Sequence, residues 1–191
     1  MLKRILILAV LVLTLSSLSV QAASLRDARL PGELPSNWEL STTEDPSIFM
    51  IQLPDSPDVK ATLTVERILR RSQFSNAALE QKLTEITMPM LQGRHLLEGD
   101  FFTQERSRFR HGRLDVFVKQ ARFQLSSATV PEEKLWGQVV VFYYNDRIYS
   151  ATFTSATSHS EDYGHQLLTS LFGIESDRHF DYNSQGAELD F

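Results

Sequence analysis

Three arginines at alternating positions are the residues of this sequence whose types and spacing best fit a binding site. Arg106, Arg108 and Arg110 lie two residues apart in the stretch QERSRFRHGRLDVFVK, so in a β-strand they share one face. His111 and Arg113 extend this basic cluster around a predicted turn. A row of this kind can bind an anion or a partner protein. Charged side chains also protect exposed strands from unwanted pairing, and we favour this second interpretation.

Residue types that carry out catalysis or bind metals form no such pattern. The sequence has no Cys, and it contains neither an H-E-x-x-H nor a G-x-S-x-G motif. The stretch SHSED at 158–162 holds Ser, His and acidic residues, but it is more typical of a helix start than of a catalytic triad. We therefore expect no catalytic residue, no metal and no cofactor. An unrecognised hydrolase that uses His159 or His165 is the weakest alternative. The five histidines are scattered: His95, His111, His159, His165 and His179.

Aromatic residues gather in the two most apolar predicted strands. Side chains of this kind usually belong to the core. A second possibility is a shallow apolar groove between sheet and helix, near Trp136 and Tyr149, which would hold a small ligand. The residues concerned are Trp136, Tyr143, Tyr144, Tyr149 and Phe153.

A long hairpin must position the arginines. We predict His111-Gly112 as its two-residue loop, because Gly tolerates a positive φ. This register pairs Arg110 with Arg113 and places Arg108 opposite Asp115, where the opposite charges favour it. Apolar residues fall on both faces of the hairpin away from its turn, which indicates that other elements pack against both faces of the sheet.

The remaining strands follow from alternation and turn chemistry. Lys60–Ile68 alternates apolar and polar residues, which is typical of a half-buried strand. Lys134–Tyr144 is the most apolar run after the N-terminal region and predicts a central strand buried on both faces. Asn145-Asp146 is a predicted tight turn into the next strand, Arg147–Thr154. Two shorter strands are predicted earlier in the chain, at Asn37–Ser41 and Ser47–Leu53.

Two amphipathic helices are predicted. The first is capped by Ser75 or Asn76, and Pro89 should end it near Thr87 or Met88. Its apolar stripe is Leu79, Leu83, Ile86 and Met90, while Glu80, Gln81, Lys82 and Glu85 are expected to face water. The second helix is capped near Ser158 or Ser160 and ends at Gly173. Its apolar residues are Tyr163, Leu167, Leu168, Leu171 and Phe172. Antiparallel strands covered by helices predict an α+β sandwich.

The N-terminus has the features of a cleaved signal peptide. Lys3 and Arg4 precede an apolar run, Ile5–Leu15, and Val20 and Ala22 occupy positions −3 and −1 of a cut after Ala22. A spanning helix needs about 20 apolar residues, and the following serines interrupt the run. We therefore expect residues 1–22 to be removed and the protein to be periplasmic, with no transmembrane segment afterwards.

The charge of the chain argues against nucleic-acid binding. The formal net charge is −5, and removal of two cations with residues 1–22 makes it −7. Attraction to phosphate dominates general nucleic-acid affinity, so an acidic protein is poorly suited to it. Residues 23–34 are a predicted polar lead-in. The acidic segment 175–191 is expected to be mostly disordered.

The order of these segments resembles the PsbP-like superfamily, including DcrB-type exported domains. The resemblance covers Leu34–Ile174. It rests on LPSNWELSTTEDPSIFMIQLP followed by KATLTVERI, on the helix NAALEQKLTEITMPML before a long hairpin, and on LWGQVVVFYYNDRIYSATFTSATSHSEDYGHQLLTSLF. It implies a three-layer α/β/α sandwich with a central antiparallel sheet, over a domain from 35 to 174. Many DcrB-type members carry a lipid-attachment Cys, and its absence here argues against a membrane-anchored role.

The resemblance also implies a role without catalysis. Similar proteins are extrinsic subunits, assembly factors, chaperone-like adaptors or immunity proteins to secreted toxins. We therefore expect an exported binding or accessory protein that acts on another envelope protein through its surface. A small-ligand carrier that uses the groove near Trp136 and Tyr149 is the alternative.

Overall fold

The computed structural model describes residues 23–68, 75–97, 103–111, 114–157 and 162–173, and at 103–111, 114 and 115 it describes the backbone. The predicted signal peptide, the acidic segment 175–191, Arg113, His159 and His179 lie outside these residues.

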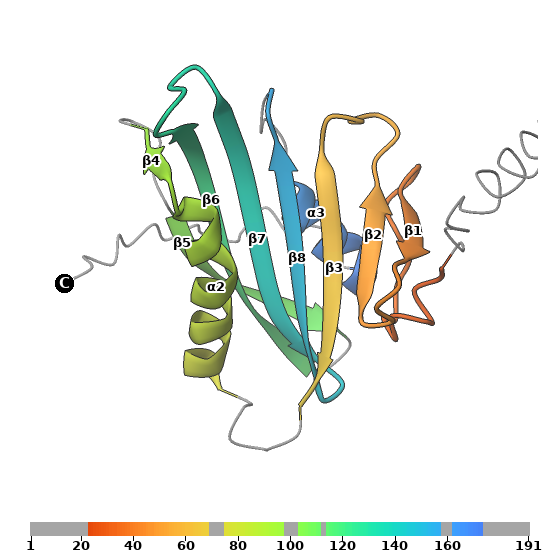
Figure 1. Ribbon diagram of the computed structural model, residues 1–191. Helices are drawn as coiled ribbons and strands as arrows, with labels where there is room; N and C mark the ends of the chain where they lie inside the picture. The colour runs from red at the N-terminus through yellow and green to blue at the C-terminus, as the bar shows by residue number, and fades with distance from the viewer. Residues whose placement is uncertain (1–22, 69–74, 98–102, 112–113, 158–161, 174–191) are drawn as a thin grey trace, which may run out of the picture.

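Within the residues that the structure describes, eight antiparallel strands form one sheet (Figure 1). The order across the sheet is β1-β2-β3-β8-β7-β6, after which β4 and β5 both pair with β6. The predicted strands are all present to within two residues at either end. Their bounds are β1 Glu39–Thr42, β2 Ile48–Gln52, β3 Lys60–Arg67, β4 Arg94–Leu96, β5 Thr103–His111, β6 Leu114–Ser127, β7 Lys134–Tyr144 and β8 Arg147–Ser155.

Helix α2 (Asn76–Leu91) covers one face of the sheet and helix α3 (Tyr163–Phe172) covers the other (Figure 1). Leu79 and Leu83 of α2 pack with odd-numbered residues of β6 and β7, whereas α3 packs with their even-numbered residues. Because successive side chains of a strand point to opposite faces, the odd and even residues of each strand pack into two separate cores. The predicted three-layer α/β/α sandwich is confirmed. Neither helix in the described ranges has the length and hydropathy of a membrane span.

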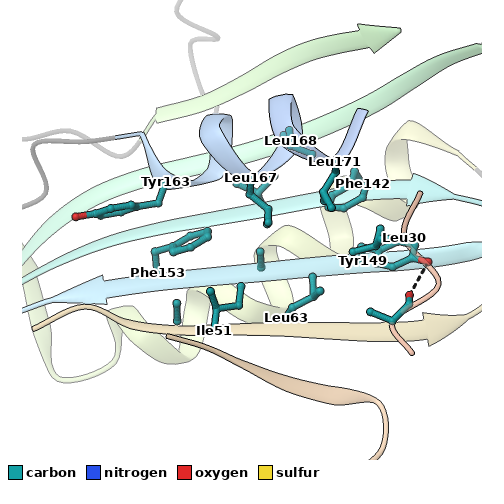
Figure 2. Packing of buried hydrophobic residues seen from close by; sticks show 14 of the residues in the cluster. Leu30, Ile51, Leu63, Phe142, Tyr149, Phe153, Tyr163, Leu167, Leu168 and Leu171 are labelled. Atoms are coloured by element: carbon teal, nitrogen blue, oxygen red, sulfur yellow. Dashed lines mark hydrogen bonds between the residues drawn. The ribbon is translucent and has the colours of Figure 1, made fainter. Parts of the chain in front are cut away.

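The core beneath α3 is rich in aromatic rings (Figure 2). Phe142 of β7 stacks on Tyr149 of β8 with ring centroids 5.0 Å apart, and Phe172 of α3 meets Phe142 edge-on at 5.9 Å. At the other end of α3, Tyr163 stacks on Phe153 at 5.7 Å. These contacts fix both ends of a ten-residue helix that would not be stable alone.

The segment that precedes β1 contributes to this same core. Ala28 and Leu30 are buried, and the hydroxyl of Tyr149 lies 3.2 Å from the carbonyl oxygens of both Ala28 and Arg29. A Cβ added at Gly32 would lie 2.1 Å from the carbonyl oxygen of Leu171, so this segment crosses α3 at close range. The polar pattern of residues 23–34 does not predict this packing.

Both helices differ from prediction at one end. Ser75 caps α2 as predicted, but the helix continues through Pro89 to Leu91. Proline removes one backbone donor, and in the exposed last turn this loss is tolerated. Asp162, rather than Ser158 or Ser160, caps α3, and its side chain accepts a hydrogen bond from the backbone N–H of His165 at 2.7 Å. Gly173 ends α3 in the left-handed conformation, as predicted.

The predicted register of the long hairpin is wrong by two residues. Arg110 pairs with Asp115 and His111 with Leu114, so two residues separate the paired ends in the sequence. A shift of two residues leaves every side chain on its predicted face, because alternation has a period of two. The hydrophobic pattern therefore could not distinguish the two registers. The predicted pairing of opposite charges is present, with Arg110 in place of Arg108.

Candidate functional site: a basic ribbon at the sheet edge

The hairpin continues beyond the body of the sheet as a two-stranded ribbon. β5 pairs with β6 from Leu114 to Arg122, but β7 pairs with β6 only from Val118 onward. We call β5 together with Leu114–Arg122 the basic ribbon. It bends toward the side of the sheet that carries α3, and β5 contacts α3 (Figure 1). Among the described strands, β6 is the sole partner of β5, so the other edge of β5 has no strand beside it.

The register places the three arginines on one face of this ribbon. Arg106 lies opposite Lys119, Arg108 opposite Phe117 and Arg110 opposite Asp115. Directly opposite residues in an antiparallel pair share a face. This is the face that α2 covers further along β6, at Ala121 and Phe123. The arginine row, predicted from spacing, thus lies on the face of α2 but on the part of the sheet nearest the hairpin turn.

Lys119 adds a fourth basic position, and sequence reasoning did not single it out. Its side chain is 3% exposed and forms an ion pair with Glu80 of α2, whose side chain is 40% exposed. Burial of an ammonium group is costly unless it is paired. Glu80 was expected to face water. It instead compensates Lys119 at the boundary between the helix-covered sheet and the ribbon.

A second helix residue departs from expectation in the same way. Lys82, also predicted to face water, pairs with Glu66 at the end of β3. The two ion pairs thus tie α2 to β3 and to β6. The acid and the base lie two residues apart on α2, and each pairs with the opposite charge on a different strand.

An exposed aromatic ring accompanies the basic positions. Phe117 is 41% exposed, although it lies between the buried Val116 and Val118. It follows Asp115 and precedes Lys119 on the same face of β6. An accessible ring among cations can make apolar contacts while the cations bind acidic groups. Among the described residues, this is the position where exposed aromatic surface and a row of basic positions coincide.

Polar groups on the opposite face hold α3 in place. Gln138 is fully buried; its Nε2 donates to Oδ1 of Asp162 at 2.5 Å, and its Oε1 accepts from the backbone N–H of Gly164 at 2.9 Å. Arg122 forms an ion pair with the other carboxylate oxygen of Asp162. Since Arg122 lies opposite Thr103, this network also attaches the base of the basic ribbon to α3.

The structure does not bring together the two residues of the predicted groove. Trp136 lies opposite Ser155, and Tyr149 lies opposite Phe142. Six residues of β7 therefore separate their positions, about 20 Å at 3.3 Å per residue. Tyr149 is completely buried, and burial raises the pKa of its hydroxyl to about 12. Trp136 is partly exposed beneath Lys134, whose Nζ lies 6.0 Å from the ring centroid.

The described histidines lie apart from one another. His95 is exposed on β4, His165 follows the cap of α3, and His111 ends β5. Among the described residues, no three side chains of His, Asp or Glu are arranged to hold a metal ion.

Comparisons with known proteins give the following matches. No protein-family model and no curated protein matches the sequence. A solved structure from Bacteroides thetaiotaomicron VPI-5482 is similar at a TM-score of 0.44 and 13% identity; the match covers 78% of this chain and 46% of that one, so this chain spans less than half its length. PsbP (CyanoP) from Synechocystis sp. PCC 6803 is similar at a TM-score of 0.47 and 9% identity, covering 78% of this chain and 88% of that one. A PsbP protein is thus among the structures that this chain resembles.

Proposed function

We propose that this chain is an exported, non-enzymatic protein of the cell envelope that binds an acidic, extended segment of another envelope protein. The basic ribbon is the proposed binding surface. The observation that carries the proposal is the register of β5 and β6, which places Arg106, Arg108 and Arg110 on one face beside the exposed ring of Phe117.

Three kinds of interaction are available to such a segment. The free edge of β5 offers backbone donors and acceptors, so an extended peptide can add to the sheet. The guanidinium groups of β5 can bind carboxylates with two hydrogen bonds each. Phe117 supplies apolar contact area at the centre of the surface, which is where interface residues contribute most to affinity.

Export is part of the proposal and depends on the N-terminal sequence. Cleavage after Ala22 would begin the mature chain at Ala23, whose backbone nitrogen donates to the carbonyl oxygen of Leu40 at 2.9 Å. The new ammonium group can keep this bond at the edge of β1. Intact-mass measurement of the periplasmic protein should give a chain that begins at Ala23, and a mass that includes residues 1–22 would contradict export with cleavage.

Peptide binding tests the surface directly. Fluorescence anisotropy would measure the affinity of the mature protein for peptides in which Asp or Glu alternates with apolar residues, and for matched peptides with Lys in place of the acids. We expect the acidic peptides to bind and Arg106→Ser/Arg108→Ser/Arg110→Ser to weaken that binding at least tenfold. The melting temperature should stay unchanged, because exposed ion pairs contribute about 0–1 kcal/mol each.

A control variant shows whether a loss of binding comes from the ribbon or only from the change in net charge. Arg26→Ser/Lys60→Ser/Arg67→Ser removes the same number of cations from exposed positions elsewhere. It should bind acidic peptides as the unmodified protein does. Equal losses in the two triple variants would show that the ribbon has no special part in binding, and equal binding of basic and acidic peptides would exclude the proposed partner chemistry.

A further inference from the structure

The end of α3 lies level with the middle of β5. Phe172, the last residue of α3, packs against Phe142 of β7. Phe142 lies opposite Val118 of β6, which in turn lies opposite Ser107 of β5. Strands are spaced by about 4.8 Å, so β5 is about 10 Å from β7 at this level. The chain therefore leaves α3 at the exposed Gly173, on the side of the sheet where α3 contacts β5.

The segment after this point is opposite in charge to β5. Residues 175–191 contain five acids and one arginine, a formal charge of −4, whereas β5 contains three arginines and one glutamate, a formal charge of +2. A fully extended chain of these 17 residues spans about 56 Å. Their length thus greatly exceeds the distance to β5.

The segment also has the alternation of a strand. Glu175, Asp177 and Asp181 occupy odd positions, while Phe180 and Tyr182 occupy even ones. In an extended conformation its first nine residues would carry acids on one face and aromatic rings on the other. β5 has the complementary arrangement, with its arginines on one face and Phe109 on the other.

We propose that residues 175–183 of this chain add to the free edge of β5 as a further strand, with the acidic positions on the arginine face. A second copy of β5 is a poor occupant of this edge, because antiparallel pairing about Ser107 places Arg106 beside Arg108. Like charges at neighbouring positions disfavour such a pair. The acidic segment of the same chain is opposite in charge to β5 and long enough to lie along its edge.

Docking of this segment would make the basic ribbon a regulated surface. A tethered segment competes at an effective concentration in the millimolar range, so a partner must displace it. This consequence rests on the proposed function, whereas the docking itself can be measured without any partner.

Hydrogen exchange of the full mature chain tests the docking. Asp177→Asn/Asp181→Asn should raise exchange rates in β5 about three- to tenfold, the range expected from the loss of two exposed ion pairs. Glu188→Gln/Asp190→Asn, which removes the same charge from the far end of the segment, should leave β5 unchanged. Exchange in β1 serves as the internal reference. Equal rates in β5 for all three proteins would overturn the proposal, as would an equal increase in the control.

A peptide added in trans tests the strand-like alternation. In a chain that ends at Ile174, β5 should exchange faster, and the synthetic peptide 175–191 should restore its protection. A peptide of the same composition with clustered acids should not restore it; equal protection by both peptides would show attraction of charge alone and overturn strand addition. If acidic test peptides bind the shortened and the full chain equally well, docking fails while the proposed function stands. If they bind neither protein, the proposed function fails, and the exchange data still decide on docking.

Discussion

Lys119 and Glu80 show how one residue pair joins the candidate surface to the body of the protein. The ammonium group is almost completely buried, yet its partner on α2 is partly open to solvent. Removal of one member of such a pair leaves the other without compensation, which costs more than replacing a buried charge by an apolar group.

Glu80→Gln should therefore lower the free energy of unfolding by about 1–3 kcal/mol. Lys119→Met, which keeps the buried hydrocarbon stem, should cost less than Glu80→Gln. Urea denaturation would measure both, with the exposed Glu85→Gln on the same helix as a control. A smaller loss for Glu80→Gln than for Lys119→Met would show that Lys119 does not depend on this carboxylate.

The buried hydroxyl of Tyr149 makes the free energy of unfolding depend on pH in the alkaline range. Burial raises its pKa from 10.0 to about 12, so the folded state holds its proton more tightly than the unfolded state. The resulting stabilisation is complete below pH 10 and is lost as the pH rises from about 10 to about 12. Burial raises the pKa of Tyr143 as well, so spectroscopic titration at alkaline pH should show more than one tyrosine that ionises with unfolding, and Tyr149→Phe should reduce the amplitude of this step. The partly exposed Tyr144 provides the control, Tyr144→Phe, which should retain it.

At the scale of elements, the segment before β1 acts as part of the sandwich. Leu30 is buried against the core beneath α3. Leu30→Ala should lower the free energy of unfolding by about 2–4 kcal/mol, the range for truncation of a buried leucine. Val130→Ala, in an exposed loop, should change it by less than about 0.5 kcal/mol. Equal effects in chemical denaturation would show that this segment does not stabilise the fold.

Alternation in the sequence determines the faces of these elements, but contacts across the sheet determine their ends and registers. The same-face placement of Arg106, Arg108 and Arg110 was predictable because it follows from a period of two. The pairing of Arg110 with Asp115 was not, since a shift of two residues preserves every face. The burial of Lys119 depends on where α2 crosses β6, and no local pattern carries that information. Asp162 caps α3 because Gln138 and Arg122, distant in sequence, hold its carboxylate.

At the scale of the whole molecule, the described polar groups of the interior serve the fold, and the basic ribbon lies outside the body that they stabilise. Gln138 and Asp162 attach α3, and Glu80 and Lys82 attach α2. Arg108 and Arg110 lie on a short two-stranded extension that β7 does not reach, whereas Arg106 lies opposite Lys119, which also pairs with β7. The sandwich thus provides the stability of the protein, and the ribbon is the surface proposed for recognition.

Salt dependence should separate these two roles. Exposed charges are screened strongly at high ionic strength, with a Debye length of about 3 Å at 1 M compared with about 10 Å at 0.1 M. Affinity for an acidic peptide should fall at least tenfold between 0.05 and 0.5 M NaCl, whereas the melting temperature should change little. Affinity that is independent of salt would contradict recognition by the arginine row.

An NMR map of where an acidic extended peptide binds would test recognition by the basic ribbon most directly. The backbone amides of the isotopically labelled mature protein would be followed during titration with that peptide. We predict that the largest shift changes fall in β5 and in the first half of β6, around Phe117, and that β1 and β2 remain unchanged. Changes confined to other parts of the sandwich, with the ribbon unaffected, would contradict the account.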